Sequence, residues 1–264
     1  LSGVGGLHKD GLGAFVLSGA NTYAGVTHIV AGIMNLRTDT ALGSTRAGTE
    51  LGRGATLELQ GGITVSGETL AIDESGLLKS VSGSNTWTGA INLLRDPPIE
   101  VEAGSVLTLS GVISGAEDVQ KTGDGTLVLT ADNTLTGTIT ILAGILQVDG
   151  AQPASPIVVV GGVLTGSGFM GPITLAGGSI QGAVMQVSPL DATKRDLIVG
   201  GTAANDDIDF LPGAGAGTVE VFLNGVSQGT FSPTGRLIAY GMAGDDDLEA
   251  SGTLSLSAWL YGGT

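Results

Sequence analysis

Carboxylates are the side chains of this sequence with the greatest capacity for chemistry. The chain has 25 Asp and Glu residues against 10 Lys and Arg, 2 His and no Cys. Hydrolysis of a glycan needs two carboxylates that face one cleft. The acidic clusters lie in the C-terminal third, at Asn205-Asp206-Asp207 and Asp245-Asp246-Asp247, and the basic residues are scattered singly except for Lys194-Arg195. This pattern offers few candidates for a catalytic cleft.

The other catalytic residue types are scarce. His8 lies just before a predicted turn, and His28 occupies an alternating strand position that predicts an outward side chain. The sequence contains no GxSxG, HExxH or P-loop pattern. The glycine cluster at Gly3–Gly6 is not followed by a predicted helix, so it does not indicate a phosphate cradle. The sequence therefore predicts a protein that is not an enzyme and has no catalytic residues.

The composition indicates a β-rich chain with many turns. Glycine accounts for 47 of the 264 residues, far above the usual ~7 %, yet 42 % of the residues are hydrophobic, which argues against disorder. Glycine costs roughly 1 kcal/mol per helical position relative to alanine, which disfavours a helical protein. The net charge of −15 argues against partners such as nucleic acid or anionic lipid. The sequence contains no run of about 18 apolar residues, so it predicts no segment that spans a membrane as a helix.

Internal repeats organise the first two thirds of the chain. The stretch from Lys9 to Leu36 aligns without a gap with the stretch from Lys121 to Val148, and 12 of 28 positions are identical. A weaker copy of the central segment lies at Gly83–Gly89. Each copy contains short alternating strands separated by Gly-x-Gly, Asn-Thr and Ala-Gly turns. Self-similarity of this kind is the signature of a repeat architecture.

The repeats predict an all-β fold in which the chain coils. Strands this short cannot bury an apolar face alone, so each must pair with an equivalent strand one coil further on. The predicted architecture is a parallel β-helix (β-solenoid) with apolar side chains inside, Thr and Ser outside, and about 20–25 residues per coil. The Asp96-Pro97-Pro98 segment is predicted to form a loop, because two prolines do not fit a central ladder.

The repeats are also similar to a known family. Segments Gly11–Gly32 and Gly123–Gly144 resemble the passenger-associated strand repeat of autotransporters, whose pattern runs roughly GxGTLxLSGxNTYTGGTTIxAGTL. The resemblance continues in a degenerate form over residues 37–185. It implies a right-handed β-helix on the bacterial cell surface, used as a stalk or adhesin rather than as a catalytic domain.

The repeat pattern stops near residue 190. We therefore predict a parallel β-helix over residues 1–190 and a small β-rich module over residues 191–264. In the second part, Asn224-Gly225 separates two alternating segments within Val219–Phe231. This predicts an antiparallel hairpin, because a type I′ turn needs positive φ at both central residues. Such a module can cap the last coil, which otherwise has an unpaired edge.

Two acidic segments of this module, Thr202–Ile208 and Gly241–Leu248, resemble the calcium-binding nonapeptide of RTX proteins, GGxGxDxLx. The resemblance implies a Ca²⁺ site, and no other cofactor is predicted. Its metal ligands would be Asp206, Asp207, Asp246 and Asp247. Calcium takes six to eight oxygens, so one copy cannot fill its shell, and the copies are about 40 residues apart instead of nine. The alternative is a pair of solvated acidic loops.

Two positions of the repeat are candidates for packing or for ligand binding. The first position holds Asn21, Asn85 and Asn133. We expect these to form an inward-stacked asparagine ladder at a solenoid corner, with a glycan-binding row as the alternative. The second position holds Tyr23, Trp87 and Leu135. The change to leucine favours packing, whereas an exposed aromatic row would indicate carbohydrate binding.

The predicted function is structural. We expect a secreted or cell-surface bacterial protein, a β-helical stalk, adhesin or fibre segment that can self-assemble; the alternative is a glycan-binding or polysaccharide-cleaving β-helix protein. Solenoid ends and edge strands predict a homo-oligomer or filament, and surface glycans are further candidate partners. The start at Leu1 predicts that flanking parts of a larger polypeptide adjoin this chain.

Overall fold

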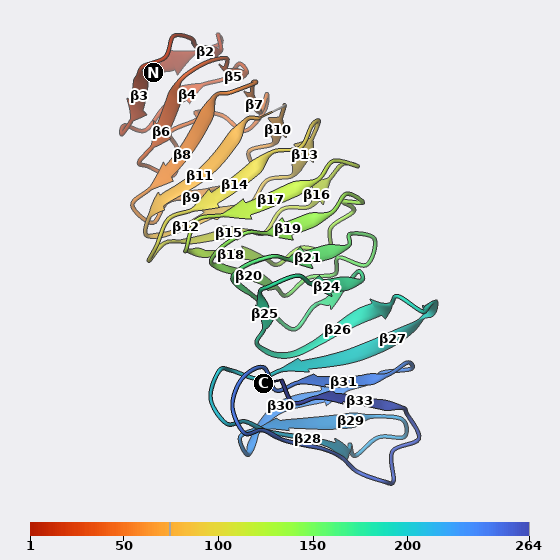
Figure 1. Cartoon of the computed structure of the whole chain (residues 1–264). Helices are drawn as coiled ribbons and strands as arrows, with labels where there is room; N and C mark the ends of the chain where they lie inside the picture. The colour runs from red at the N-terminus through yellow and green to blue at the C-terminus, as the bar shows by residue number, and fades with distance from the viewer. Residues whose placement is uncertain (74, 264) are drawn as a thin grey trace.

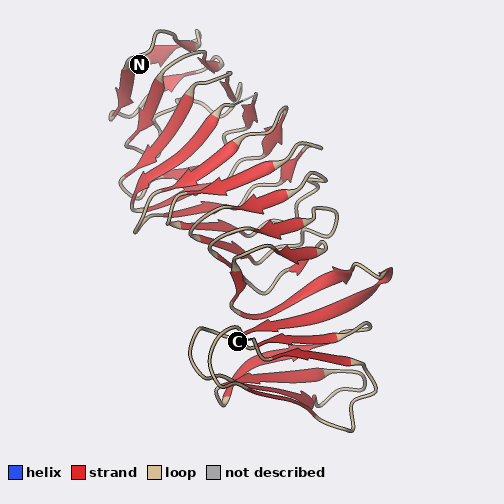
Figure 2. Ribbon diagram, in the orientation of Figure 1, coloured by secondary structure: helices blue, strands red, loops and turns tan. Residues whose placement is uncertain are grey.

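The chain coils into a parallel β-solenoid that leads into a smaller β-rich module (Figure 1). The coordinates are a computed structural model, which describes residues 1–73 and 75–263. Every regular element within these ranges is a strand (Figure 2). The described part of the chain therefore contains no helix that is long and apolar enough to span a membrane. The predicted all-β solenoid is confirmed.

Three parallel sheets form the faces of the solenoid, and each strand pairs with the strands one coil before and after it. The first face contains β2 (Leu7–Lys9), β5 (Thr27–Ile29), β7 (Thr49–Leu51), β10 (Leu70–Ile72), β13 (Ile91–Leu93) and β16 (Ile113–Ser114). The second face contains β3 (Ala14–Leu17), β6 (Ile33–Leu36), β8 (Thr56–Gln60), β11 (Leu77–Ser82), β14 (Pro98–Val101), β17 (Val119–Thr122), β19 (Ile139–Ile141), β21 (Ile157–Val159) and β24 (Ile173–Leu175). The third face contains β9 (Thr64–Val65), β12 (Ser84–Trp87), β15 (Val106–Leu109), β18 (Thr126–Leu129), β20 (Ile145–Val148), β22 (Val163–Thr165) and β25 (Ser179–Ile180). The short strands β1 (Ser2–Gly3) and β4 (Thr22–Tyr23) pair at the N-terminal end.

One apolar core runs along the inside of the solenoid. Successive register partners on the second face form a buried column: Met34, Leu57, Leu78 and Ile99. Alternate residues point outward, as in the third-face column Thr64, Thr86 and Thr108. Because successive side chains of a strand point to opposite faces, one register serves both the core and the surface.

Two details differ from the sequence-based expectation. Met34 and its register partner Leu57 are 23 residues apart in the sequence, whereas Val159 and its partner Leu175 are only 16 apart. The last coils are therefore shorter than predicted. The strands of both coils are of similar length, so the difference lies in the connecting turns. Pro98 is the first residue of β14 rather than part of a loop, since the missing N–H is tolerated where a strand begins.

The two full repeats lie on different faces of the solenoid. The register partners of Thr27 on the following coils of the first face are Thr49, Leu70, Ile91 and Ile113. Ile139, which aligns with Thr27 in the repeat, instead lies on the second face between Val119 and Ile157. The same sequence pattern is therefore used one face further round the axis in the second copy.

The C-terminal module is a wider coil made of two sheets. Its strands are β26 (Gly182–Ser188), β27 (Asp191–Gly200), β28 (Asp207–Pro212), β29 (Val219–Leu223), β30 (Val226–Phe231), β31 (Leu237–Tyr240), β32 (Asp247–Ala250) and β33 (Ala258–Tyr261). β26 pairs in parallel with β23 (Phe169–Met170) and antiparallel with β27, so it joins the two parts of the chain. The predicted boundary between residues 190 and 191 falls in the turn between β26 and β27. A second apolar cluster lies between the sheets, around Phe210.

The predicted hairpin is confirmed at β29 and β30. Asn224 and Gly225 have φ values of 54° and 73°, as a type I′ turn requires. On either side of the hairpin, Leu197 pairs in parallel with Leu237, and Asp207 with Asp247. The two residues of each pair are 40 positions apart in the sequence, so the hairpin is an insertion within one long coil.

Gly144 offers a test of how closely the coils approach. Its φ is +68°, and a Cβ there would lie 2.5 Å from the carbonyl oxygens of both Gly123 and Gly125. We expect Gly144→Ala to lower the free energy of unfolding by about 2–4 kcal/mol, from backbone strain and overpacking together. Gly104 has a φ of +74° and open space around it, so Gly104→Ala should lose only about 1 kcal/mol. Equal losses in urea unfolding would contradict this coil spacing.

Candidate functional site

A buried lysine stands near the start of the second repeat. Lys121 is fully buried at an inward position of the second face, where its register partners are Ile99 and Ile141. Its ammonium group donates hydrogen bonds to the carbonyl oxygens of Thr122 at 2.9 Å, Gly123 at 2.7 Å and Ala143 at 3.1 Å. Burial lowers the pKa of Lys121 to about 8. A lysine of lowered pKa can act as a nucleophile, but this amine is enclosed by backbone and joins two coils.

Lys9 occupies the same setting in the first repeat. Its ammonium group donates to the carbonyl oxygens of Asp10, Gly11 and Ala31, at 3.1, 2.6 and 2.8 Å. We call these two arrangements the lysine clamps. The two lysines align in the repeat, but the sequence gives no sign of the clamps, because one acceptor of each lies 22 residues further along the chain and only the coil register brings it near.

The clamp at Lys121 can be tested by removing its charge. Lys121→Met keeps the aliphatic stem but leaves three carbonyl oxygens without their donor. We expect a loss of roughly 1–3 kcal/mol in the free energy of unfolding, the usual cost of unsatisfied buried polar groups. Lys194 is exposed on β27, so Lys194→Met should change stability by less than ~0.5 kcal/mol. Similar urea midpoints for the two variants would exclude the clamp as a stabilising element.

The three recurrent asparagines are buried, as predicted, but they do not stack on one another. Asn21 Nδ2 donates to the carbonyl oxygen of Ala41 at 2.6 Å. The Asn85 Oδ1 accepts from the N–H groups of Gly62 and Ile63, both at 3.0 Å. Asn133 Oδ1 accepts from the N–H of Ile113. Each asparagine thus bridges to the backbone of a neighbouring coil. The expected ladder is wrong because the three copies are not in adjacent coils.

The aromatic position of the repeat is used for packing. Tyr23, Trp87 and Leu135 are all buried. The Tyr23 hydroxyl lies 2.6 Å from Thr27 Oγ1 inside the solenoid. Packing at this position is therefore confirmed. The glycan-binding alternative required an exposed groove at Trp87 or Tyr23, and their burial contradicts it at this place.

The two acidic segments of the C-terminal module lie one above the other. Asp206 is buried, and its Oδ2 accepts from the N–H of Thr202 at 2.6 Å and from its hydroxyl at 2.9 Å. Asn224 donates to its Oδ1 at 2.8 Å. The Asp206 N–H donates to Asp246 Oδ1 at 2.9 Å on the next coil. Burial alone would raise the pKa of Asp206, but the hydrogen bonds from Thr202 and Asn224 outweigh it and lower the pKa.

The predicted calcium ligands are only partly brought together. Asp207 and Asp247 are exposed register partners on β28 and β32. The Asp246 Oδ2 is buried without a hydrogen-bond partner, whereas both Asp206 oxygens already accept from protein donors. Among the described residues, no group of three or more His, Cys, Asp or Glu side chains is arranged to hold a metal ion. Calcium binding stays a prediction. In this structure the Asp206 carboxylate accepts hydrogen bonds from Thr202 and Asn224 within its own coil, and the Asp246 carboxylate accepts from the preceding coil.

The two histidines lie side by side on the first face. His8 and His28 are register partners, and their ring centroids are 6.2 Å apart. His28 Nδ1 lies 2.9 Å from Glu50 Oε2 on the next coil. The outward direction predicted for His28 is confirmed by its half-exposed side chain. The pairing with His8 was missed, because nothing within either segment shows which residue will be its neighbour one coil away.

Glu68 places a carboxylate in the interior of the solenoid. It lies between β9 and β10 and is 2 % exposed. Its Oε1 accepts from the Thr49 hydroxyl at 2.7 Å. Burial raises the pKa of Glu68, and the Thr49 hydrogen bond offsets part of this effect. Thr49 pairs with Thr27, the partner of the Tyr23 hydroxyl, so a buried polar cluster crosses two coils.

Comparison with known protein families finds a match to the two segments that contain the lysine clamps. The family model of the passenger-associated-transport-repeat matches residues 7–36 and 119–148, which contain Lys9 and Lys121. Two segments of the chain thus match this passenger repeat. The resemblance seen in the sequence is thereby confirmed for these repeats, whereas the RTX resemblance stays a prediction.

A curated relative supports the same assignment. The chain is 28 % identical over 260 residues to the Adhesin BmaC autotransporter of Brucella suis biovar 1 (strain 1330). The alignment covers 88 % of this chain but only 7 % of the relative, so the chain spans a small part of that protein's length. No solved structure matches the chain significantly. The passenger repeats and the relative point to the bacterial cell surface or the extracellular space.

Proposed function

We propose that this chain is a non-catalytic, adhesin-like segment of a β-helical protein on the bacterial surface. The observation that carries the proposal is the combination of passenger repeats with one continuous solenoid core. A stack of coils, each hydrogen-bonded to the next, holds distant parts of a polypeptide at a fixed separation without disulfides. Similarity to the Adhesin BmaC autotransporter supports a role in attachment.

The attachment role can be tested in the full-length protein on the cells that make it. We expect that deletion of residues 1–264 from the longer protein reduces adherence of the bacteria to host cells several-fold. Antibodies against the remaining parts serve as the control, because they must still label intact cells. Unchanged adherence with normal surface labelling would contradict the proposal. Failure of antibodies against residues 1–264 to label intact wild-type cells would contradict the surface location.

We also propose that copies of the isolated chain, separated from any flanking sequence, associate end to end. The edge strand β33 exposes Trp259, Leu260 and Tyr261, which are 41, 40 and 45 % exposed. At the other end, the edge strand β3 exposes Phe15 and Val16. Both edges belong to parallel pairs, so each can accept a further strand in the same direction. A contact between two different ends repeats from copy to copy and generates a filament.

End-to-end association predicts a concentration-dependent increase in particle length. Sedimentation velocity and negative-stain microscopy of the wild-type chain should show larger species as concentration rises. Leu260→Lys should abolish them, because lysine on an edge strand opposes further pairing. Leu190, exposed in the turn between β26 and β27, gives the control Leu190→Lys, which should assemble normally. Monomers at every concentration, or equal assembly of both variants, would contradict this proposal.

A further inference from the structure

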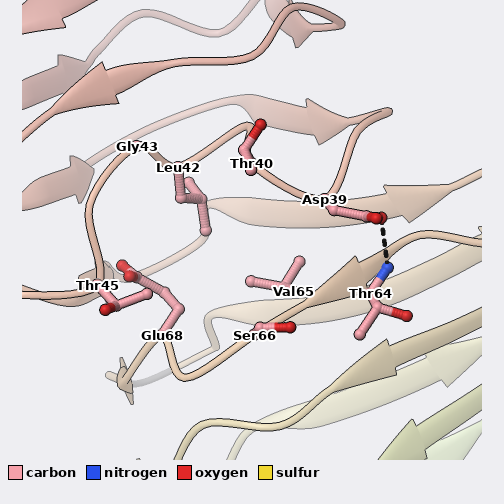
Figure 3. A pocket seen from close by; sticks show the side chains of 9 residues that line it. All are labelled: Asp39, Thr40, Leu42, Gly43, Thr45, Thr64, Val65, Ser66 and Glu68. Carbon is pink, nitrogen blue, oxygen red and sulfur yellow. Dashed lines mark hydrogen bonds between the residues drawn. The ribbon is translucent and has the colours of Figure 1, made fainter.

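A pocket opens beside the buried carboxylate Glu68, where the loop over residues 37–48 passes across the turn that follows β9 (Figure 3). Its volume is about 320 Å³. The wall residues are Asp39, Thr40, Leu42, Gly43, Thr45, Thr64, Val65, Ser66 and Glu68. The wall therefore holds two carboxylates and several hydroxyls, and no Lys or Arg is among these residues.

Glu68 supplies one end of the pocket with a hydrogen-bond acceptor that is not in use. Its Oε1 is bonded to Thr49, but the described residues offer Oε2 no hydrogen bond. Figure 3 shows the Glu68 carboxylate pointing toward the loop that carries Gly43 and Thr45. A nearly buried carboxylate with one free oxygen gains most from a ligand that donates hydrogen bonds and carries positive charge.

Asp39 supplies the opposite end. Its Oδ1 accepts from the Thr64 N–H at 2.7 Å, which fixes the side chain at the rim (Figure 3). The apolar side chain of Val65 lies between Asp39 and Glu68 in this view, and Leu42 is part of the same wall. The wall is thus acidic at its two ends and apolar between them.

We propose that this pocket binds a short alkyl diamine, with one ammonium group at Glu68 and the other at Asp39. The methylene chain contacts Val65 and Leu42, and the hydroxyls of Thr45 and Ser66 accept the remaining N–H donors. A monoamine satisfies only one carboxylate, and a neutral sugar supplies no charge to either. Matching two charges across an apolar segment therefore selects diamines over both.

A titration of the whole chain with butane-1,4-diamine, monitored by ¹H–¹⁵N NMR, tests the proposal. Saturable shifts are expected in the amide signals of residues 42–45 and 64–68. Binding of butylamine should be at least tenfold weaker. Glu68→Gln keeps an oxygen that accepts from Thr49 but removes the charge, and Asp39→Asn does the same at the other end, so each should weaken diamine binding at least tenfold.

Matched controls separate this site from general attraction to an acidic protein. Glu249→Gln removes one exposed carboxylate from the C-terminal module and should leave the affinity unchanged. The thermal unfolding temperature of Glu68→Gln should match or exceed that of the wild type, because the substitution removes one buried charge, and this result would show that the variant is folded. The absence of saturable shifts in the wild type, equal affinity for butylamine, or unchanged affinity in Glu68→Gln would overturn the proposal.

Discussion

Parallel hydrogen bonding between coils is the constraint on which this structure depends. Paired strands lie ~4.8 Å apart, so every inward side chain must pack against its register partner, and every turn must pass close to the turn of the adjacent coil. Gly144 has room for no Cβ for this reason, and the lysine clamps take their third acceptor from the next coil. The same pairing carries into the C-terminal module, where Asp206 bonds across coils to Asp246. Stability, shape and the exposed edges all follow from one repeated contact.

The repeat encodes a local shape and not a position around the axis. In the first copy it occupies the first and second faces, and in the second copy the second and third, yet Lys9 and Lys121 have equivalent carbonyl cages. Three similar faces make this rotation possible, because a strand–turn–strand unit meets a parallel strand of the adjacent coil on whichever face it begins. Coils can therefore differ in length without loss of the core. Loops such as residues 37–48 add special features, among them the pocket at Glu68.

The sequence was sufficient for those features that depend on neighbouring residues. Alternation predicted the strands, Asn224-Gly225 predicted the hairpin, and the change from Trp87 to Leu135 predicted packing. The sequence was insufficient for contacts between residues on different coils. These contacts depend on the strand register, and the register depends on turn lengths that vary from coil to coil. The pairing of His8 with His28 and the acceptors of Lys121 belong to this class.

Cysteine cross-linking tests the coil register most directly, because the chain has no native cysteine. Gln120 and Thr140 are outward register partners on the second face, whereas Gln147 lies on the third face. A short bis-methanethiosulfonate reagent should join the cysteines of the Gln120→Cys, Thr140→Cys variant and leave those of the Gln120→Cys, Gln147→Cys variant unlinked. Equal linking of both pairs, or linking of the second pair alone, would contradict the parallel solenoid described here.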